Sequence, residues 1–241
     1  MRSFQLVCLA FFCSLVLLAC QNPEPFPEVP QKIRAELHIL NAYSEANIDV
    51  KIDQFDQTKK VADDLSFLES WPTTGYASLL ITPQTDSTAS ISDLKIQLID
   101  NDTQEELVPV PDFQLKSEFP TTLCIVDSFG SPLVVRTIDD YEESVEPGMA
   151  QVRFLNLSAS VLSVSLEVKN DSFKIDFFNF LNYSQFKIIP KGVKTFYFID
   201  DFSKEVIDSI PNLEIRARQV YNFYLADDGA DPLGGYEILD Q

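Results

Sequence analysis

The chain has 241 residues, with 18 basic and 37 acidic side chains and one histidine, for a formal net charge of −19. A surface of that sign argues against nucleic acid as a partner and against electrostatic attachment to anionic lipid. Because His38 is the single histidine, the sequence excludes a multi-histidine zinc site and an H-E-x-x-H motif, and a histidine-based triad would have to use His38 itself.

The N-terminal residues 1–19 have the layout of a signal peptide. Arg2 supplies a positive start, and residues 6–18 form an apolar run that only Ser14 interrupts. As a helix this run of 13 residues would measure about 20 Å, which is short of the ~30 Å hydrocarbon core of a bilayer. The sequence therefore predicts a cleaved leader rather than a transmembrane helix.

The end of this run, Leu17-Leu18-Ala19-Cys20, resembles the lipobox of bacterial lipoproteins. The resemblance implies that residues 1–19 are removed and that Cys20 carries the lipid. The alternative is an ordinary secretory signal with an incidental cysteine. Gln21 after the cysteine resembles the pattern of lipoproteins sent to the outer membrane. We therefore expect a lipid anchor in the cell outer membrane, facing either the surface or the periplasm.

The next segment, residues 20–31, carries prolines at 23, 25, 27 and 30. Alternating prolines favour an extended spacer of ~3.1 Å per residue. Two or more acyl chains hold a protein on a bilayer far more firmly than one does. The segment therefore predicts a lipidated, proline-rich tether.

After the tether, apolar and polar residues alternate with period two, which is typical of half-buried strands. Predicted strands cover residues 35–41, 48–52, 76–82, 91–100, 106–110, 121–128 and 133–138. The acidic stretch from 139 to 148 follows them. We expect one β-sandwich domain at 32–146 and a second at 147–241.

The second half repeats the first. Residues 35–41 align with 150–156 at an offset of 115, residues 75–83 with 182–190 at 107, and residues 123–127 with 223–227 at 100. The decreasing offset predicts insertions in the first copy, placed at 59–71 and 84–90, where function often lies.

Four segments of the second half, residues 153–158, 163–168, 183–192 and 221–226, resemble a bacterial family known as domain of unknown function 4397 (DUF4397), often found in tandem on lipoproteins. The first copy departs from the pattern, with Ala42-Tyr43-Ser44 after its asparagine and no glycine after Pro83. The resemblance implies an all-β protein with two tandem immunoglobulin-like β-sandwiches. It implies no active site.

Two side chains invite a chemical role. His38 aligns with Arg153, and alternation places both opposite their apolar neighbours, so we expect them to face solvent. Cys124 aligns with Tyr224 in an apolar strand and is expected to be a buried, inert thiol; a reactive or intermolecular cysteine is the alternative.

Acidic clusters raise the question of calcium. The best candidates are Asp100-Asn101-Asp102 with Glu105, and Asp227-Asp228 with Asp231. Neither has the spacing of an EF-hand, so we expect plain turns there.

Aromatic residues gather in the second copy. Alternation predicts Phe173, Ile175 and Phe177 on one face of a strand and Phe178 and Phe180 on the other. The aromatics that do not fit one core either pack between domains or form a platform for sugar rings or a protein partner.

The sequence thus predicts no catalytic residue, no cofactor and no metal site. We expect a non-catalytic, membrane-anchored lipoprotein that binds a polysaccharide or protein ligand at the cell envelope. A periplasm-facing structural or assembly partner is the alternative. A carboxylate-dependent glycan hydrolase is a more distant one.

Overall fold

The computed structural model describes residues 33–54, 57–73, 75–81, 91–109, 113–116, 120–141, 145–229 and 231–239. The predicted signal peptide, Cys20 and the tether lie outside these residues. All regular structure in the described part is strand, and no helix there is long and apolar enough to span a membrane.

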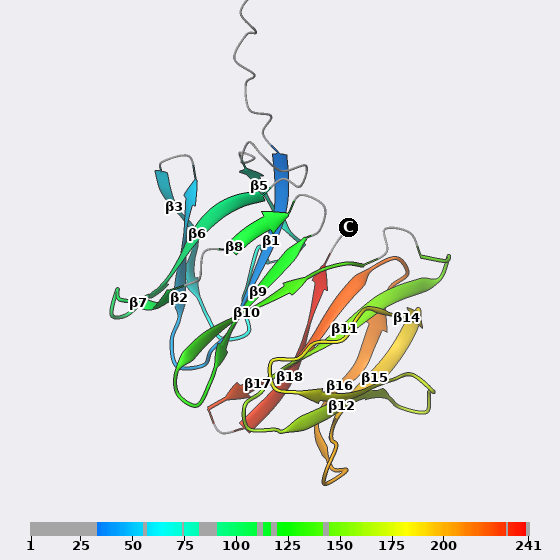
Figure 1. Cartoon of the computed structure of the whole chain (residues 1–241). Helices are drawn as coiled ribbons and strands as arrows, with labels where there is room; N and C mark the ends of the chain where they lie inside the picture. Colours follow the sequence, from blue (N-terminus) through cyan, green and yellow to red (C-terminus); the bar gives the residue numbers. More distant parts are fainter. Residues whose placement is uncertain are drawn as a thin grey trace, which may run out of the picture. The chain divides into compact units, whose positions relative to one another are not determined.

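The first half contains two mainly antiparallel sheets, drawn in blue to green in Figure 1. One has the order β10-β9-β1-β4, with β5 also paired to β1, and the other has the order β3-β2-β6-β7, with β8 also paired to β6. Its strands are β1 (Ile33–Ala42), β2 (Ile48–Gln54), β3 (Gln57–Leu65), β4 (Ser70–Trp71), β5 (Ala77–Ile81), β6 (Ile91–Asp100), β7 (Glu106–Pro109), β8 (Phe113–Lys116), β9 (Thr121–Asp127) and β10 (Pro132–Ile138).

The second half repeats this plan with sheets ordered β14-β11-β17-β18 and β13-β12-β15-β16. Its strands are β11 (Met149–Leu157), β12 (Ser163–Val168), β13 (Lys174–Asn179), β14 (Lys187–Pro190), β15 (Gly192–Asp200), β16 (Val206–Ile215), β17 (Val220–Asp228) and β18 (Asp231–Leu239). The prediction of an all-β chain with two tandem β-sandwiches is confirmed.

The first strand of each half pairs in parallel with the last strand but one, β1 with β9 and β11 with β17. The first and second strands of each half lie in opposite sheets. All other named ladders are antiparallel. Each sandwich encloses its own cluster of buried aliphatic and aromatic side chains.

The ladders test the repeat residue by residue. The offsets of 115 and 100 hold, since Leu37 faces Thr121 as Val152 faces Tyr221. The offset of 107 is wrong: Leu79 faces Ala35 as Ile189 faces Ala150, an offset of 110.

The reason lies just before that strand. Tyr183 bridges Leu155 as Ser70 pairs with Leu40, so Ser70, and not Tyr76, is the structural counterpart of Tyr183. The alignment matched Tyr76 to Tyr183 because the residue types are identical, although the segment before this strand differs in length between the two copies.

The repeated asparagines, Asn41 and Asn156, are fully buried and close equivalent turns. The Asn41 amide donates to the Leu65 carbonyl at 2.9 Å, and the Asn156 amide donates to the Phe178 carbonyl at 2.9 Å. Each side-chain oxygen accepts the backbone N–H two residues later. Their recurrence is explained by structure, because buried backbone groups need partners.

A third buried cluster joins the two sandwiches. It combines Leu40, Ala42, Cys124 and Val126 of the first with Leu155, Leu157, Tyr224 and Ala226 of the second. Each member of the first set is the repeat counterpart of one in the second, at offsets of 115 or 100. The sandwiches therefore pack through equivalent faces, and Cys124 is buried as predicted.

Candidate functional site: the groove between the two sandwiches

A row of polar side chains borders this apolar contact. His38, Thr122 and Thr137 are neighbours across β1, β9 and β10. Arg153, Asn222 and Glu237 are neighbours across β11, β17 and β18. All face the boundary between the sandwiches, and the two rows are repeat counterparts.

The expectation that His38 and Arg153 face solvent is wrong, since each is only 1% exposed. Alternation does turn them away from the core of their own sandwich. The other sandwich covers that outward face, so both side chains are buried between the two sandwiches and not exposed to solvent.

Arg153 forms an ion pair with Asp139, which follows β10. Nη1 of Arg153 lies 2.6 Å from Oδ1 of Asp139, and the two side chains are 1% and 0% exposed. Asp139 also accepts hydrogen bonds from the hydroxyls of Tyr76 (2.8 Å), Thr122 (2.5 Å) and Thr137 (2.9 Å). A buried carboxylate needs such a set of donors.

The guanidinium of Arg153 is held from other sides as well. Its Nε donates to Oδ1 of Asn222 at 3.0 Å, and its centre lies 4.6 Å from the Phe186 ring and 5.6 Å from the Tyr183 ring. Stacking of this kind on aromatic faces is typical of buried arginine. The pair fixes the connection between the sandwiches.

His38 forms the second charged contact. Its Nδ1 donates to the Gly75 carbonyl at 2.8 Å, and its Nε2 lies 3.0 Å from Oε2 of Glu237. The latter contact is poorly aligned for a hydrogen bond, so its attraction is mainly electrostatic. Burial lowers the pKa of His38, but the Glu237 carboxylate, the Gly75 carbonyl and Asp139 outweigh it and raise that pKa above 6.5.

A groove of about 630 Å³ opens beside this contact. Residues from Val61 to Thr73 of the first sandwich form one wall, and Tyr224 and residues 236–238 of the second form the other. Its aromatic side chains are Tyr224, the half-buried Trp71 and Tyr236, which is 38% exposed. This volume lies in the ordinary range for ligand sites.

The groove extends beyond Tyr236. A second hollow of about 450 Å³ is lined by Tyr236, Ile238 and residues from Ile210 to Arg216. Since both hollows share Tyr236 and Ile238, an elongated ligand would cross this strand.

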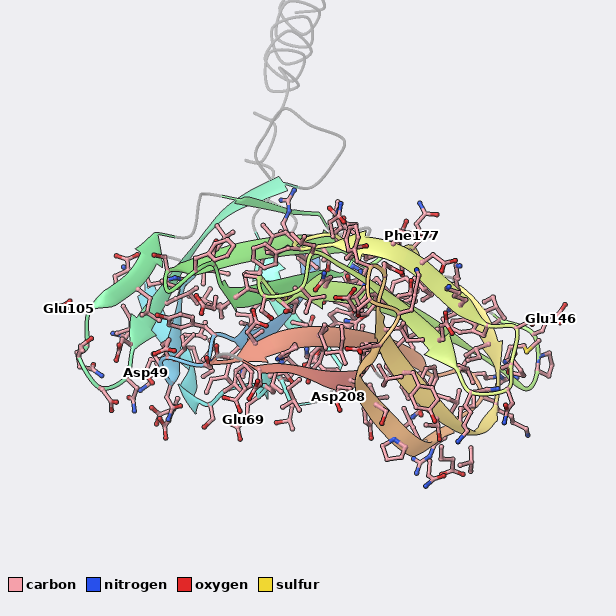
Figure 2. All side chains as sticks on the ribbon, turned by 90° about the horizontal axis from the view of Figure 1, so that it is seen from below. Asp49, Glu69, Glu105, Glu146, Phe177 and Asp208 are labelled. Carbon is pink, nitrogen blue, oxygen red and sulfur yellow. The ribbon has the colours of Figure 1, made fainter. Side chains whose placement is uncertain are left out.

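The ionisable side chains that line the main groove are acidic, and one of them, Asp63, is ion-paired with Lys60 just outside the lining. Asp63, Glu69 and Glu237 line the groove, and among the described lining residues none is basic. Figure 2 labels Glu69 on the first sandwich. Such a groove repels anionic ligands.

The insertion predicted at 59–71 is wrong, because Ser70 corresponds to Tyr183 at an offset of 113, which leaves the first copy only two extra residues between Leu40 and Ser70. Residues of this stretch nevertheless supply much of one wall. Most of it is strand, in β3 and β4, rather than loop. The second predicted insertion, at 84–90, lies outside the described residues.

The calcium candidates serve as turns. Oδ1 of Asp100 accepts the N–H groups of Asp102 at 2.8 Å and Thr103 at 3.0 Å. Asp227 accepts hydrogen bonds from Ser158, Ala159 and Ser160. Within the described ranges, no three His, Cys, Asp or Glu side chains gather as a metal site would require.

The predicted faces of the aromatic strand are wrong, because β13 contains a bulge. Val164 faces Phe178 while Leu166 faces Ile175, so Ile175 and Phe178 both turn toward the core. Phe177 has a φ of 58° and is 67% exposed. An extra residue in one strand reverses the alternation beyond it.

The exposed aromatics are thus not the predicted ones. Phe178 packs on the second core and Phe180 on the contact between the sandwiches. Phe177, labelled in Figure 2, has the Lys204 ammonium 5.7 Å from its ring, and Leu162 and Phe202, which flank the backbone hydrogen bond from Asp201 to Ser163, are 75% and 74% exposed. We call Leu162, Phe177 and Phe202 the apolar patch.

No protein family and no curated protein matches the chain. Solved structures give weak similarities. A candidate cell adhesion protein from Bacteroides uniformis ATCC 8492 is 10% identical with a TM-score of 0.22, over 85% of this chain and 96% of that one. A candidate adhesin from Bacteroides ovatus is 10% identical with a TM-score of 0.21, over 82% and 90%. Similarities this low assign neither a fold nor a function, so the resemblance to DUF4397 stays a prediction.

Proposed function

We propose that this chain is a non-catalytic binding protein, anchored in the outer membrane by lipid on Cys20, whose ligand lies in the groove between the sandwiches. The ligand class is a neutral or amino-sugar polysaccharide. The observation that carries the proposal is a groove built by both sandwiches, with Trp71 and Tyr236 among its lining.

Aromatic faces in an open groove suit sugar rings, whose axial C–H groups pack on them while hydroxyls reach polar side chains. The carboxylates of Asp63 and Glu69 are acceptors for such hydroxyls. Among the described residues the main groove has no basic lining, which disfavours uronic-acid or sulfated polymers there, whereas the second hollow carries Arg216 beside Glu214. The shared hollow across Tyr236 fits a chain of several sugars rather than one.

Binding is tested with the purified mature chain, from Cys20 onward, by titration calorimetry against neutral glucans and mannans and against alginate. Tyr236→Ala should weaken binding about five- to thirteenfold, since stacking on one ring contributes roughly 1–1.5 kcal/mol. Phe129→Ala, which removes an aromatic ring that is 84% exposed and does not line the groove, is the matched control. Equal affinity of wild type and Tyr236→Ala for every ligand would remove the groove as the site.

The lipid anchor and the side of the outer membrane that the sandwiches face are tested on intact cells. Labelled palmitate should enter the chain and be lost in Cys20→Ser. Protease added to intact cells should remove the Gln241 end if the sandwiches face outward, with a periplasmic lipoprotein as control. Protection until the outer membrane is permeabilised would leave the anchor but place the ligand in the periplasm.

One observation favours a second function, that of a structural or assembly partner in the envelope. The apolar patch exposes three large side chains of the second sandwich, and large apolar side chains in solvent can mark protein contacts. Crosslinking in cells from a photoreactive residue at 202 should trap an envelope protein. The same residue at 129 is the control, and identical products from both positions would contradict this function.

A further inference from the structure

We infer that His38 and Glu237 form a proton-operated latch that holds the two walls of the groove together. The latch closes when the pair shares a proton and loosens when that proton leaves. Its effect on ligand affinity rests on the proposed function; the latch itself does not.

The latch is connected to both walls. Gly75 accepts the hydrogen bond from Nδ1 of His38 and, through its N–H, contacts the Ile238 carbonyl of the second sandwich at 3.5 Å. Glu237 and Ile238 line one side of the groove, and the segment leading to Gly75 supplies Trp71 and Thr73 on the other. Movement at His38 is therefore transmitted to both sides.

The geometry requires two protons in the His38–Glu237 pair. Nδ1 must carry one, because its partner is a carbonyl oxygen. Nε2 and the Glu237 carboxyl oxygen 3.0 Å away must share the other, since neither can face the other without a proton between them. Without it, a nitrogen lone pair would face a buried carboxylate, and Oε1 of Glu237 has no other hydrogen-bond partner among the described residues.

The other ionisable groups around His38 do not exchange a proton with it near neutral pH. Burial raises the pKa of Tyr76, whose ring lies 6.1 Å away, and raises the pKa of the Cys124 thiol. Asp139 favours the charged imidazole but is itself engaged by Arg153. The proton that changes near neutral pH is thus that of His38.

The sign follows from the direction of the shift. Because the pKa of His38 is raised above 6.5 in the closed state, the contribution to closure is complete below pH 6.5. It is lost as the pH rises through the raised pKa. The ratio of closed to open forms changes about tenfold for each pKa unit between the two states.

The chain carries its own reporters, since His38 is its one histidine and Trp71 its one tryptophan. Proton NMR of the mature chain gives the pKa of His38, and acrylamide quenching of Trp71 fluorescence gives the opening of the groove. We expect a His38 pKa above 6.5 and quenching that increases with the same midpoint. Glu237→Gln should lower that pKa and abolish the pH dependence of quenching, whereas Glu146→Gln, at an exposed site, should change neither.

A His38 pKa at or below 6.5, or quenching that stays constant through the titration, would overturn the latch. A circular dichroism spectrum equal to that of wild type checks that Glu237→Gln is folded. If no polysaccharide binds at any pH while both titrations behave as expected, the proposed function fails and the latch stands. If a polysaccharide binds with an affinity independent of pH from 6 to 9, the control of binding by the latch is refuted.

Discussion

Asp139→Asn tests the buried ion pair at the junction of the sandwiches. The substitution keeps the shape of the side chain and removes its charge, so the Arg153 guanidinium, 1% exposed, stays buried without its counter-ion. Its contacts with Asn222 and with the Phe186 ring remain.

Removing one partner of a buried pair costs about 3–5 kcal/mol, because the remaining charge keeps its desolvation penalty. We expect a loss of about 3 kcal/mol, at the low end, since these remaining contacts still stabilise the guanidinium. Urea unfolding followed by Trp71 fluorescence and circular dichroism measures the change.

The single variants Asp139→Leu and Arg153→Met and their double variant form a double-mutant cycle. Exchanging both charges for apolar groups of similar volume is often neutral or stabilising, so the double variant should be more stable than Asp139→Asn. A double variant whose loss equals the sum of the single losses, within about 0.5 kcal/mol, would refute the coupling of these residues.

Three other substitutions or probes address the packing. Gly235→Ala would place a Cβ 2.3 Å from the Tyr224 ring, so we expect a loss of about 1–3 kcal/mol from overpacking, seen in thermal unfolding; an unchanged melting temperature would contradict this contact. Phe177→Gly should stabilise the chain by about 1 kcal/mol, because the residue is exposed and has a φ of 58° that glycine adopts freely; lower stability would show that its exposed ring packs. Cys124 should react with a thiol reagent only on unfolding, since it lies between the sandwiches; rapid reaction of the folded chain would disprove that packing.

The period-two pattern predicted β1, β2, β5, β6, β7, β9 and β10 because it reflects a property of each strand alone, but it missed β3, β4 and β8. The pattern does not show what covers the outward face of a strand. For this reason it predicts that His38 and Arg153 face solvent, although the other sandwich covers them. A signal was present: Leu40, Cys124 and Val126 are apolar at outward positions of the same strands. Strands covered on both faces read as apolar runs, and these runs indicated burial on both sides.

The bulge at Phe177 had no such signal. A bulge is set by the ladder with the neighbouring strand, here Val164 and Leu166, so it depends on contacts distant in the sequence. The stretch at 59–71, which lines one wall of the groove, was singled out for an insertion that the strand register does not bear out. The other wall of the groove, with Tyr236 and Glu237, comes from the far end of the chain and follows only from the packing of the two sandwiches.

The most direct test of the groove uses the single tryptophan. The indole N–H signal of Trp71 is recorded by NMR while a neutral oligosaccharide or an acidic one is added to the mature chain. A groove that binds a non-anionic polysaccharide predicts a saturable shift of this signal with the neutral sugar, a weaker one with the acidic sugar, and in Tyr236→Ala a shift that needs about five to thirteen times more neutral sugar to saturate. A signal that stays in place while calorimetry reports binding would locate the ligand elsewhere and contradict the account.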